Sequence, residues 1–363
     1  MVRMLCIVNH SVIFNSEIKI FERLGIETYT PMFIPTSDPD LRSIQTRNNI
    51  TSLPKDIVEK LDAHSFWTEE WDYEIRSIIS NYFDIVYVAI NSYLTPLHQS
   101  LMFFNKLIIA RAFGREIPYR YEDFLQMKPK LNLANLIKNN SKFYFVPVFK
   151  QILEIEPSYL IQQNDVIGLS LPDDWFKYKN SWCGENFSKI IFLCPNINDS
   201  IYYNNLYLKF KHYFKNFDHA IFGKQYTKVN DPCVLEYLAE DTLFKLYQTS
   251  KLLVYLSSEP RHLHYTPIEC MLVGLPVIYL KGSLLSEIIN YNINLNEADF
   301  GECKDMEEMV QKVQYLLSDT ESSRIHLKEI KRIQLSIASS FNSEFFLKQW
   351  VKFLGGQNIS LSI

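Results

Sequence analysis

The sequence predicts an α/β protein with two domains, each built around a parallel β-sheet. Its 363 residues are enough for two domains of ordinary size with separate cores. Short aliphatic and β-branched runs recur between helical segments, as parallel strands covered on both faces require. Several of these runs end in polar loops that lead into helices. Each half therefore has the strand–loop–helix order of a Rossmann-like domain.

Composition restricts the function classes that remain open. The apolar fraction of 47% is that of a globular protein, and a net charge of −4 gives no reason to expect nucleic-acid binding. The six cysteines show no CxxC spacing, which favours free thiols in a reducing compartment. No run reaches the ~18–20 apolar residues of a membrane span. Residues 1–8 are too short for a signal peptide and lack a cleavage site, so they predict the first strand.

The first half opens with an apolar strand at 5–8, followed by the polar turn Asn9-His10-Ser11 and a helix at 17–24. The turn-rich stretch 30–65 predicts one amphipathic piece, around residues 57–61. The other elements expected here are helix 69–82 and strands 26–29, 85–90, 107–110 and 143–146. Arg111, Arg115 and Glu116 follow strand 107–110, at the edge where open α/β sheets place ligands.

The second half repeats this order. We expect domains at 1–171 and 189–341, joined by a linker at 172–188. The loop 195–199 is expected after the first strand of the second domain, and Gly223-Lys224 after its second strand. The elements expected between 189 and 249 are strands 189–194, 219–222 and 234–238 and helices 203–214 and 241–249. Tyr202 and Tyr203 are expected to belong to the helix core.

The most informative stretch is 252–280. Buried strands are expected at 252–256 and 276–280, and the loop between them holds serines, an acid, an arginine, two histidines and a tyrosine. A simple connection would need only a few small polar residues. The composition of this loop therefore indicates a ligand site.

A short helix leads out of this loop. Thr266 is expected to cap it, with Pro267 at its first position, where a missing N–H costs nothing. Gly274 ends the helix and Pro276 prevents its continuation. The exposed N–H groups at the start of the helix would suit a phosphate. Glu269 lies within the first turn, close enough to accept a hydrogen bond from a hydroxyl of the same ligand.

The run Ile268-Glu-Cys-Met-Leu-Val-Gly-Leu-Pro-Val-Ile278 resembles the donor-site signature of GT-B glycosyltransferases, in particular the retaining group that includes sucrose and glycogen synthases. The resemblance is specific over residues 189–318 and rests on strand–helix order alone over 1–171. It implies two Rossmann-like domains facing each other across a cleft. It also implies that a terminal helix within 342–363 crosses back to the first domain.

The resemblance assigns donor-binding roles to residues of the second domain. Glu269 would bind the ribose of a nucleotide sugar, and the diphosphate would lie against His264, Tyr265 and Thr266. The turn Gly223-Lys224 would also face the diphosphate. The family pairs its glutamate with a second acid eight positions earlier, where this chain has Arg261.

For catalysis, the resemblance implies no cofactor and no metal, so that the helix N–H groups with Arg261 or Lys224 would stabilise charge on the leaving diphosphate. His10 and His264 are the catalytic candidates. With inversion, His10 would act as the base on the acceptor hydroxyl; with retention, the leaving phosphate would take the proton. Arg111, Arg115 and Glu116 are the acceptor-binding candidates.

Structural alternatives stand beside several of these roles. Glu269 also suits a first helical turn through the helix dipole alone, and Arg261 has Glu259 as a potential ion-pair partner. Arg111 and Arg115 could equally be solvated. His262 and His264 alternate along the loop and are expected to point to opposite sides, with His264 toward the ligand. A His-x-His pair can bind metal, but no carboxylate or cysteine lies at a suitable local spacing.

The sequence thus predicts a metal-independent glycosyltransferase that moves a sugar from a nucleotide sugar to a saccharide or lipid-linked saccharide, in surface-polysaccharide or glycoconjugate synthesis. It is expected to be cytoplasmic or at the inner face of the membrane, with peripheral membrane association as a further expectation. One alternative is a transferase that uses a cytidine-monophosphate-activated sugar acid. Another is a non-catalytic sugar- or nucleotide-binding protein of the same fold.

Overall fold

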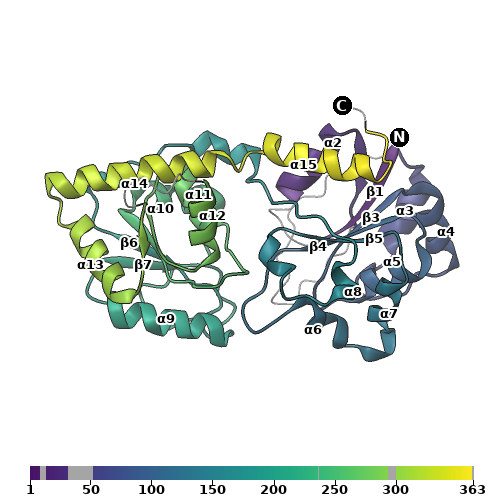
Figure 1. The fold of residues 1–363 in the computed structure, drawn as a ribbon, viewed down its shortest axis with the longest axis horizontal. Coiled ribbons are helices and arrows are strands. Elements are labelled where there is room, and N and C mark those ends of the chain that lie inside the picture. Colours follow the sequence, from purple (N-terminus) through teal and green to yellow (C-terminus); the bar gives the residue numbers. More distant parts are fainter. Residues whose placement is uncertain (9–13, 32–51, 236, 293–299, 362–363) are drawn as a thin grey trace. The chain divides into compact units, whose positions relative to one another are not determined.

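The computed structural model describes residues 1–8, 14–31, 52–235, 237–292 and 300–361 (Figure 1). The chain divides into two compact units, one formed by residues 1–173 with 342–363 and the other by residues 174–341. In the described residues, each unit holds one five-stranded sheet whose strands are all parallel. The predicted α/β class is confirmed.

The strands of the first unit are β1 (Val2–Ile7), β2 (Ile26–Tyr29), β3 (Ile85–Ala89), β4 (Leu107–Ala112) and β5 (Phe143–Pro147). They lie in the order β2-β1-β3-β4-β5, so β1 has its successor on one side and β3 on the other. Leu5 of β1 is in register with Tyr29 of β2 and Val86 of β3. The chain therefore reverses its direction of winding at β1, and the gap between the carboxyl ends of β1 and β3 is a topological switch point.

Helices surround this sheet. They are a π-helical turn η1 (Phe14–Ile18), α2 (Lys19–Arg23), α3 (Lys55–Ala63), α4 (Tyr73–Tyr82), α5 (Thr95–Phe103), α6 (Tyr121–Gln126), α7 (Leu133–Lys138), α8 (Ser158–Ile161) and α15 (Ser343–Gly356). Helix α4 starts later than the sequence predicts because Asp72 caps it, accepting a 2.8 Å hydrogen bond from the N–H of Ile75. The short helices α6 to α8 were not expected.

The last helix, α15, belongs to the first unit. The indole of Trp350 packs edge-on against Phe21 of α2, with ring centroids 4.8 Å apart, and is buried. Gln349 accepts a 3.1 Å hydrogen bond from the N–H of Gly168. A Cβ at Gly168 would lie 2.2 Å from the ring of Phe346, so any larger residue there would require this ring to shift. These contacts fix α15 on the first unit.

The second unit repeats the winding of the first. Its strands are β6 (Ile190–Leu193), β7 (His219–Phe222), β8 (Leu252–Tyr255), β9 (Val277–Leu280) and β10 (Glu302–Cys303). Their order is β10-β9-β8-β6-β7, which again sets the second strand on one side of the first and the third on the other. The switch point of this sheet therefore lies between the carboxyl ends of β6 and β8.

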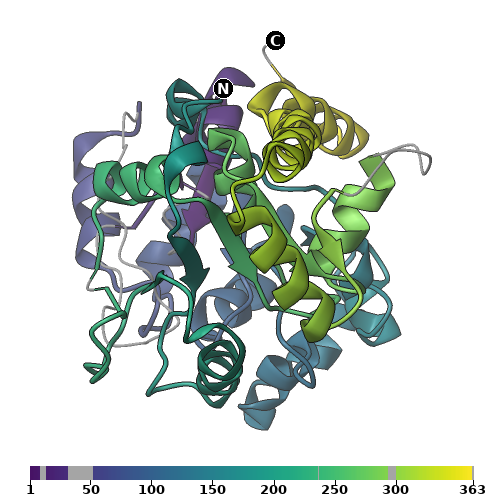
Figure 2. The ribbon, with the colours of Figure 1, turned by 90° about the vertical axis from the view of Figure 1, so that its left-hand side faces the viewer.

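Helices cover both faces of this second sheet (Figures 1 and 2). They are α9 (Ile201–Phe214), α10 (Glu240–Thr249), α11 (Thr266–Val273), α12 (Leu284–Asn292), α13 (Met306–Leu317) and α14 (Glu321–Ser339). Helix α9 packs with α13, whereas α11 packs with α10 and α14. Ser200, Asp305 and Thr320 cap α9, α13 and α14 through their side-chain oxygens.

One predicted strand of this unit is wrong. In the described residues around 234–238, pairing to the sheet is a single bridge between Ile221 and Val234. The N–H of Ile221 donates to the carbonyl of Cys233, and the N–H of Leu235 donates to the carbonyl of Ile221. In the described residues, the hydrogen bonds of this segment to the sheet do not extend beyond this bridge. Among its described residues, the connection from β7 to α10 thus pairs with the edge of the sheet only at Val234.

A partly buried ion pair anchors that connection to α9. Asp231, with a side chain only 7% exposed, lies 2.9 Å from the ammonium of Lys211 and accepts a 2.7 Å hydrogen bond from Tyr207. Burial alone would raise the pKa of Asp231, but bonds from Lys211, the Cys233 N–H and Tyr207 outweigh it and lower that pKa from 3.8 to about 2. The carboxylate is therefore more stable in the folded protein than in the unfolded chain.

We expect Asp231→Asn to reduce the free energy of unfolding by about 2 kcal/mol at pH 7. A folded-state pKa below the unfolded value stabilises the protein above about pH 4, and this contribution is lost as the pH falls toward 2. Urea unfolding followed by circular dichroism at pH 7 and pH 2.5 should show a difference between variant and parent that shrinks at the lower pH. An equal difference at both values would contradict the assignment.

Candidate functional site

The switch point of the second sheet brings two loops together. The loop after β6, residues 194–200, and the loop after β8, residues 256–265, both leave the carboxyl edge of neighbouring strands. Open α/β sheets bind ligands at this place because the two connections turn to opposite faces and leave a crevice. The predicted donor residues around 261–269 lie on the second of these loops and on the helix that follows it.

The loop after β6 is held by the turn that follows β7. Gly223 has φ +125°, and a Cβ on it would lie 2.8 Å from the nitrogen of Pro195, so glycine is required for this close approach. The N–H of Asn196 donates to the carbonyl of Lys224 over 2.9 Å. Gln225 accepts from the N–H of Ile197 at 2.9 Å and donates to the carbonyl of residue 194 at 2.7 Å. The predicted Gly223 turn therefore shapes the edge of the candidate site.

Two tyrosines at the start of α9 reach across to the loop after β8. The hydroxyl of Tyr202 lies 3.0 Å from Oγ of Ser257, and the hydroxyl of Tyr203 lies 2.7 Å from Nε2 of His264. The expectation that both tyrosines belong to the helix core is wrong, because their hydroxyls join the start of α9 to the loop after β8. Their position directly after the loop that follows β6 was the available signal in the sequence.

Helix α11 starts one residue earlier than predicted. Tyr265 occupies the cap position, Thr266 is the first helical residue and Pro267 the second, where its missing N–H is still without cost. Tyr265 has helical backbone angles and makes no side-chain cap bond, so its side chain leaves the first N–H groups of α11 uncapped. Gly274 ends the helix at φ +93°, as expected.

Glu269 lies in the first turn of α11 and is 7% exposed. The hydroxyl of Tyr247, from the fully buried face of α10, donates to its Oε2 over 3.1 Å. Burial, followed by the nearby Glu269 carboxylate, raises the pKa of Tyr247 well above its usual range. Tyr247 therefore stays protonated and holds one carboxylate oxygen in place. Sequence reasoning did not find this tyrosine.

Arg261 is the most unusual charge in the unit. It is only 8% exposed, yet it has no hydrogen bond or ion pair with any residue in the described part of the chain, Glu259 included. Taking an arginine out of water without a counter-charge costs several kcal/mol, roughly, unless a ligand supplies one. Its guanidinium presents five donors in a planar fork that matches phosphate or carboxylate. Arg261 is therefore suited to bind an anion.

Lys224 and the two histidines complete the predicted set. Lys224 is exposed, with its ammonium 4.9 Å from the ring centroid of Tyr226. The rings of His262 and His264 contact each other edge to face, with centroids 4.7 Å apart. The expectation that they point to opposite sides is wrong because this loop is not an extended strand. Within the residues that the structure describes, no cluster of three or more metal-binding side chains occurs.

The structure corrects the role predicted for Arg111 in the first unit. Strand β4 extends beyond residue 110, so Arg111 is part of the sheet, and its side chain is fully buried. Its guanidinium pairs with Glu17 and donates to the Tyr87 hydroxyl and to backbone carbonyls of 146, 167 and 168. All five donors are used within the protein, so Arg111 has none left for an acceptor.

The remaining predicted residues of the first unit have different outcomes. His10 lies outside the described residues. Arg115 and Glu116 follow β4 at the carboxyl edge of the sheet and are partly exposed. The guanidinium of Arg115 lies 3.8 Å from the ring centroid of Phe124 and 5.0 Å from that of Tyr119. Their acceptor role stays a prediction.

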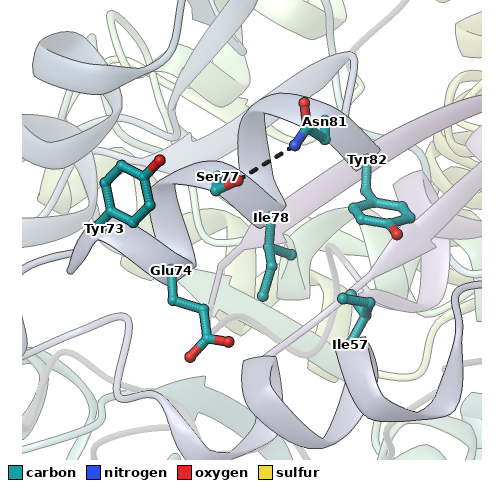
Figure 3. Close-up of a pocket in the computed structure, with 7 residues that line it drawn as sticks. All are labelled: Ile57, Tyr73, Glu74, Ser77, Ile78, Asn81 and Tyr82. Carbon is teal, nitrogen blue, oxygen red and sulfur yellow. Dashed lines mark hydrogen bonds between the residues drawn. The ribbon is translucent and has the colours of Figure 1, made fainter.

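A separate surface hollow lies between α3 and α4 (Figure 3). Its side chains come from the outer face of α4 and from Ile57 of α3, and the amide of Asn81 donates to Ser77 over 3.3 Å. It contains none of the predicted site residues. No helix in the described ranges is long and apolar enough to cross a membrane.

No protein-family model matches this chain, and no curated protein matches its sequence. Solved structures do match over nearly the whole chain. Sucrose-phosphate synthase from Thermosynechococcus elongatus is 11% identical with a TM-score of 0.61, over 98% of this chain and 99% of that one. A glycosyltransferase from Rickettsia africae is 17% identical with a TM-score of 0.60, over 98% of each chain.

A third match is Anabaena Alr3699/HepE in complex with UDP-glucose. It is 12% identical, with a TM-score of 0.62, and the match covers 98% of this chain and all of that chain. Sucrose-phosphate synthase and HepE are GT-B proteins, and each match covers nearly the whole of both chains. The chain therefore has the α/β fold of the GT-B glycosyltransferases.

Proposed function

We propose that this protein is a glycosyltransferase that takes its sugar from a nucleotide-sugar donor bound by the second unit. The observation that carries the proposal is that one loop–helix segment at a switch point holds both the Glu269 carboxylate and the buried Arg261, which has no partner among the described residues. A diphosphate needs a cationic hydrogen-bond donor such as Arg261, and ribose hydroxyls need an acceptor such as the Glu269 carboxylate. The GT-B fold and the UDP-glucose bound by HepE support the same reading.

In this proposal, Glu269 accepts hydrogen bonds from the ribose hydroxyls, and Tyr247 keeps its carboxylate oriented. The N–H groups at the start of α11, which the Tyr265 side chain does not cap, and the guanidinium of Arg261 hold the diphosphate, with Lys224 at the exposed rim. Charge builds up on the diphosphate as the glycosidic bond breaks. Fixed donors that face it lower the barrier without help from a metal ion.

The acceptor side is assigned to the first unit, with Arg115 and Glu116 as the contacts. An inverting reaction needs a base on the acceptor hydroxyl, for which His10 is proposed; a retaining reaction lets the leaving phosphate take that proton. His264, hydrogen-bonded to Tyr203, is proposed to contact the donor. The acceptor is proposed to be a saccharide or lipid-linked saccharide, in polysaccharide or glycoconjugate synthesis in the cytoplasm.

A sugar acid activated by cytidine monophosphate is the alternative donor. The observation that favours it is the identity of residue 261, because the family signature has an acid at this place and arginine would pair with a sugar carboxylate. The donor panel below includes this class. Turnover of donor in the presence of acceptor separates both transferases from a non-catalytic binding protein.

We expect Glu269→Ala to weaken binding of the cognate nucleotide sugar about tenfold or more, the free energy of one hydrogen bond to a charged group. The test is a thermal-shift screen against uridine, guanosine, adenosine, thymidine and cytidine sugar nucleotides, since a ligand that binds only the folded state raises Tm. Glu321→Ala is the matched control, because Glu321 is an exposed first-turn acid of α14.

A shift with one nucleotide class that falls in Glu269→Ala and persists in Glu321→Ala identifies the donor base. A folded protein that responds to none of the five classes contradicts the proposed function. An equal shift in parent and Glu269→Ala would leave the donor assignment intact but remove Glu269 from the ribose site.

A further inference from the structure

Exposed apolar side chains gather on the first unit just after β4. Ile117 and Tyr119 are each 53% exposed and Met127 is 58% exposed, within eleven residues of sequence. Large apolar groups so exposed and so close together cost free energy in water unless another surface covers them. We call the exposed side chains of residues 115–130 the 115–130 surface.

Ring contacts show that this surface is continuous. The guanidinium of Arg115 lies over both Phe124 and Tyr119, at 3.8 and 5.0 Å from their ring centroids. Phe124 and Met127 are three residues apart at the end of α6, so they share one side of that helical turn. The apolar groups before and after α6 thus join through Arg115.

Basic side chains outnumber acidic ones by one around these apolar groups. Residues 115–130 hold four basic and three acidic side chains, in a chain whose net charge is −4. Glu122 pairs with Arg120 at 2.8 Å, so these two charges offset each other, and Asp123 accepts the N–H of residue 120 at 2.6 Å. In the part of the chain that the structure describes, no carboxylate pairs with Arg115, Lys128 or Lys130.

We propose that the 115–130 surface binds an anionic lipid membrane. Aromatic and aliphatic side chains flanked by lysine and arginine fit the boundary between lipid headgroups and acyl chains, where one part is buried and the other meets phosphate. The lysines follow the apolar group in sequence, and both are exposed. The partner is thus identified by two matching chemistries, apolar burial and opposite charge.

The position of this surface gives membrane binding a use. It begins directly after the carboxyl end of β4, the edge of the sheet where open α/β folds bind ligands. A membrane bound there would hold a lipid-linked acceptor beside the unit assigned to it. This link to the acceptor rests on the proposed function, whereas binding to the lipid surface does not.

The experiment uses the full chain and flotation with vesicles of phosphatidylcholine alone or with 30% phosphatidylglycerol. We expect binding to the anionic vesicles only, weakening as salt is raised from 0.05 to 0.5 M because counter-ions screen the attraction. Lys128→Glu/Lys130→Glu and Tyr119→Ser/Met127→Ser should each reduce the bound fraction at least tenfold. The matched control, Leu208→Ser/Lys215→Glu, changes an exposed apolar group of α9 and the exposed lysine that follows this helix, and should bind like the parent.

Circular dichroism and the donor-induced thermal shift show whether each variant is folded. Equal binding to both vesicle types, no binding to either, or binding that neither surface variant reduces would overturn the proposal. If vesicles bind as expected while no nucleotide sugar does, the proposed function fails and the lipid surface stands. The reverse result, donor binding without vesicle binding, removes only the lipid surface.

Discussion

Arg261→Met is expected to weaken binding of the nucleotide-sugar donor by about 10- to 100-fold, the loss of about 1.5–3 kcal/mol for hydrogen bonds to a charged group. The same substitution should raise the Tm of the ligand-free protein. Arg261 is buried without a counter-charge in the described residues, so a methionine of similar length removes a desolvation cost and keeps the apolar contacts of the stem. Isothermal titration with the donor and a thermal melt without it measure the two effects.

The opposite signs of these two effects separate a ligand-binding role from a structural one. An arginine that holds the loop together would lower Tm when replaced and affect binding only through folding. Arg261→Lys keeps the charge but loses the planar fork, so its affinity should fall between parent and Arg261→Met. Arg332→Met is the control, since Arg332 is an exposed arginine of α14 paired with Glu329. A lower Tm with unchanged affinity would contradict the donor role of Arg261.

The sequence predicted those parts of the fold whose signals are local. The strand 219–222 and the end of α11 at Gly274 were placed correctly because an apolar run bounded by turn residues and a glycine with positive φ leave their mark in neighbouring residues. The strand predicted at 234–238 was wrong because that prediction also used local composition alone. The segment has the composition of a strand, but a strand also needs a partner along its length, and in the described part of this segment only Val234 has one.

In the candidate site, too, residues close together in sequence could be predicted and contacts between distant residues could not. Glu269 and the residues before it could be found because they are neighbours in one short stretch. Tyr203 and His264 are 61 residues apart, and Tyr247 and Glu269 are 22 apart, so only the order of the strands brings them into contact. Arg111 was misjudged because the residue that neutralises it, Glu17, lies 94 positions away on a π-helical turn. A charge at a strand end shows no sign in sequence of being buried.

The buried ion pair between Arg111 and Glu17 is expected to have the largest effect on stability. Arg111→Met is expected to reduce the free energy of unfolding of the first unit by about 3–5 kcal/mol. The substitution leaves the buried Glu17 carboxylate with the Tyr87 hydroxyl as its only hydrogen-bond partner among the described residues. Burial would lower the pKa of Arg111, but Glu17 and Tyr87 raise it, so the guanidinium is charged at any pH where the protein is folded. Urea unfolding at pH 7 measures the loss.

The double variant Glu17→Gln/Arg111→Met decides how that loss arises. If the cost comes from an uncompensated charge, removing the second charge should recover a large part of the 3–5 kcal/mol, roughly, since a neutral amide can still accept from Tyr87. If the cost instead comes from the guanidinium bonds to the carbonyls of 146, 167 and 168, the double variant should be no more stable than Arg111→Met. The second outcome would make Arg111 a clamp that ties β4 and β5 to the segment under α15. The first makes it chiefly the counter-ion that lets Glu17 be buried, and we expect the first because the pair lies fully inside the core.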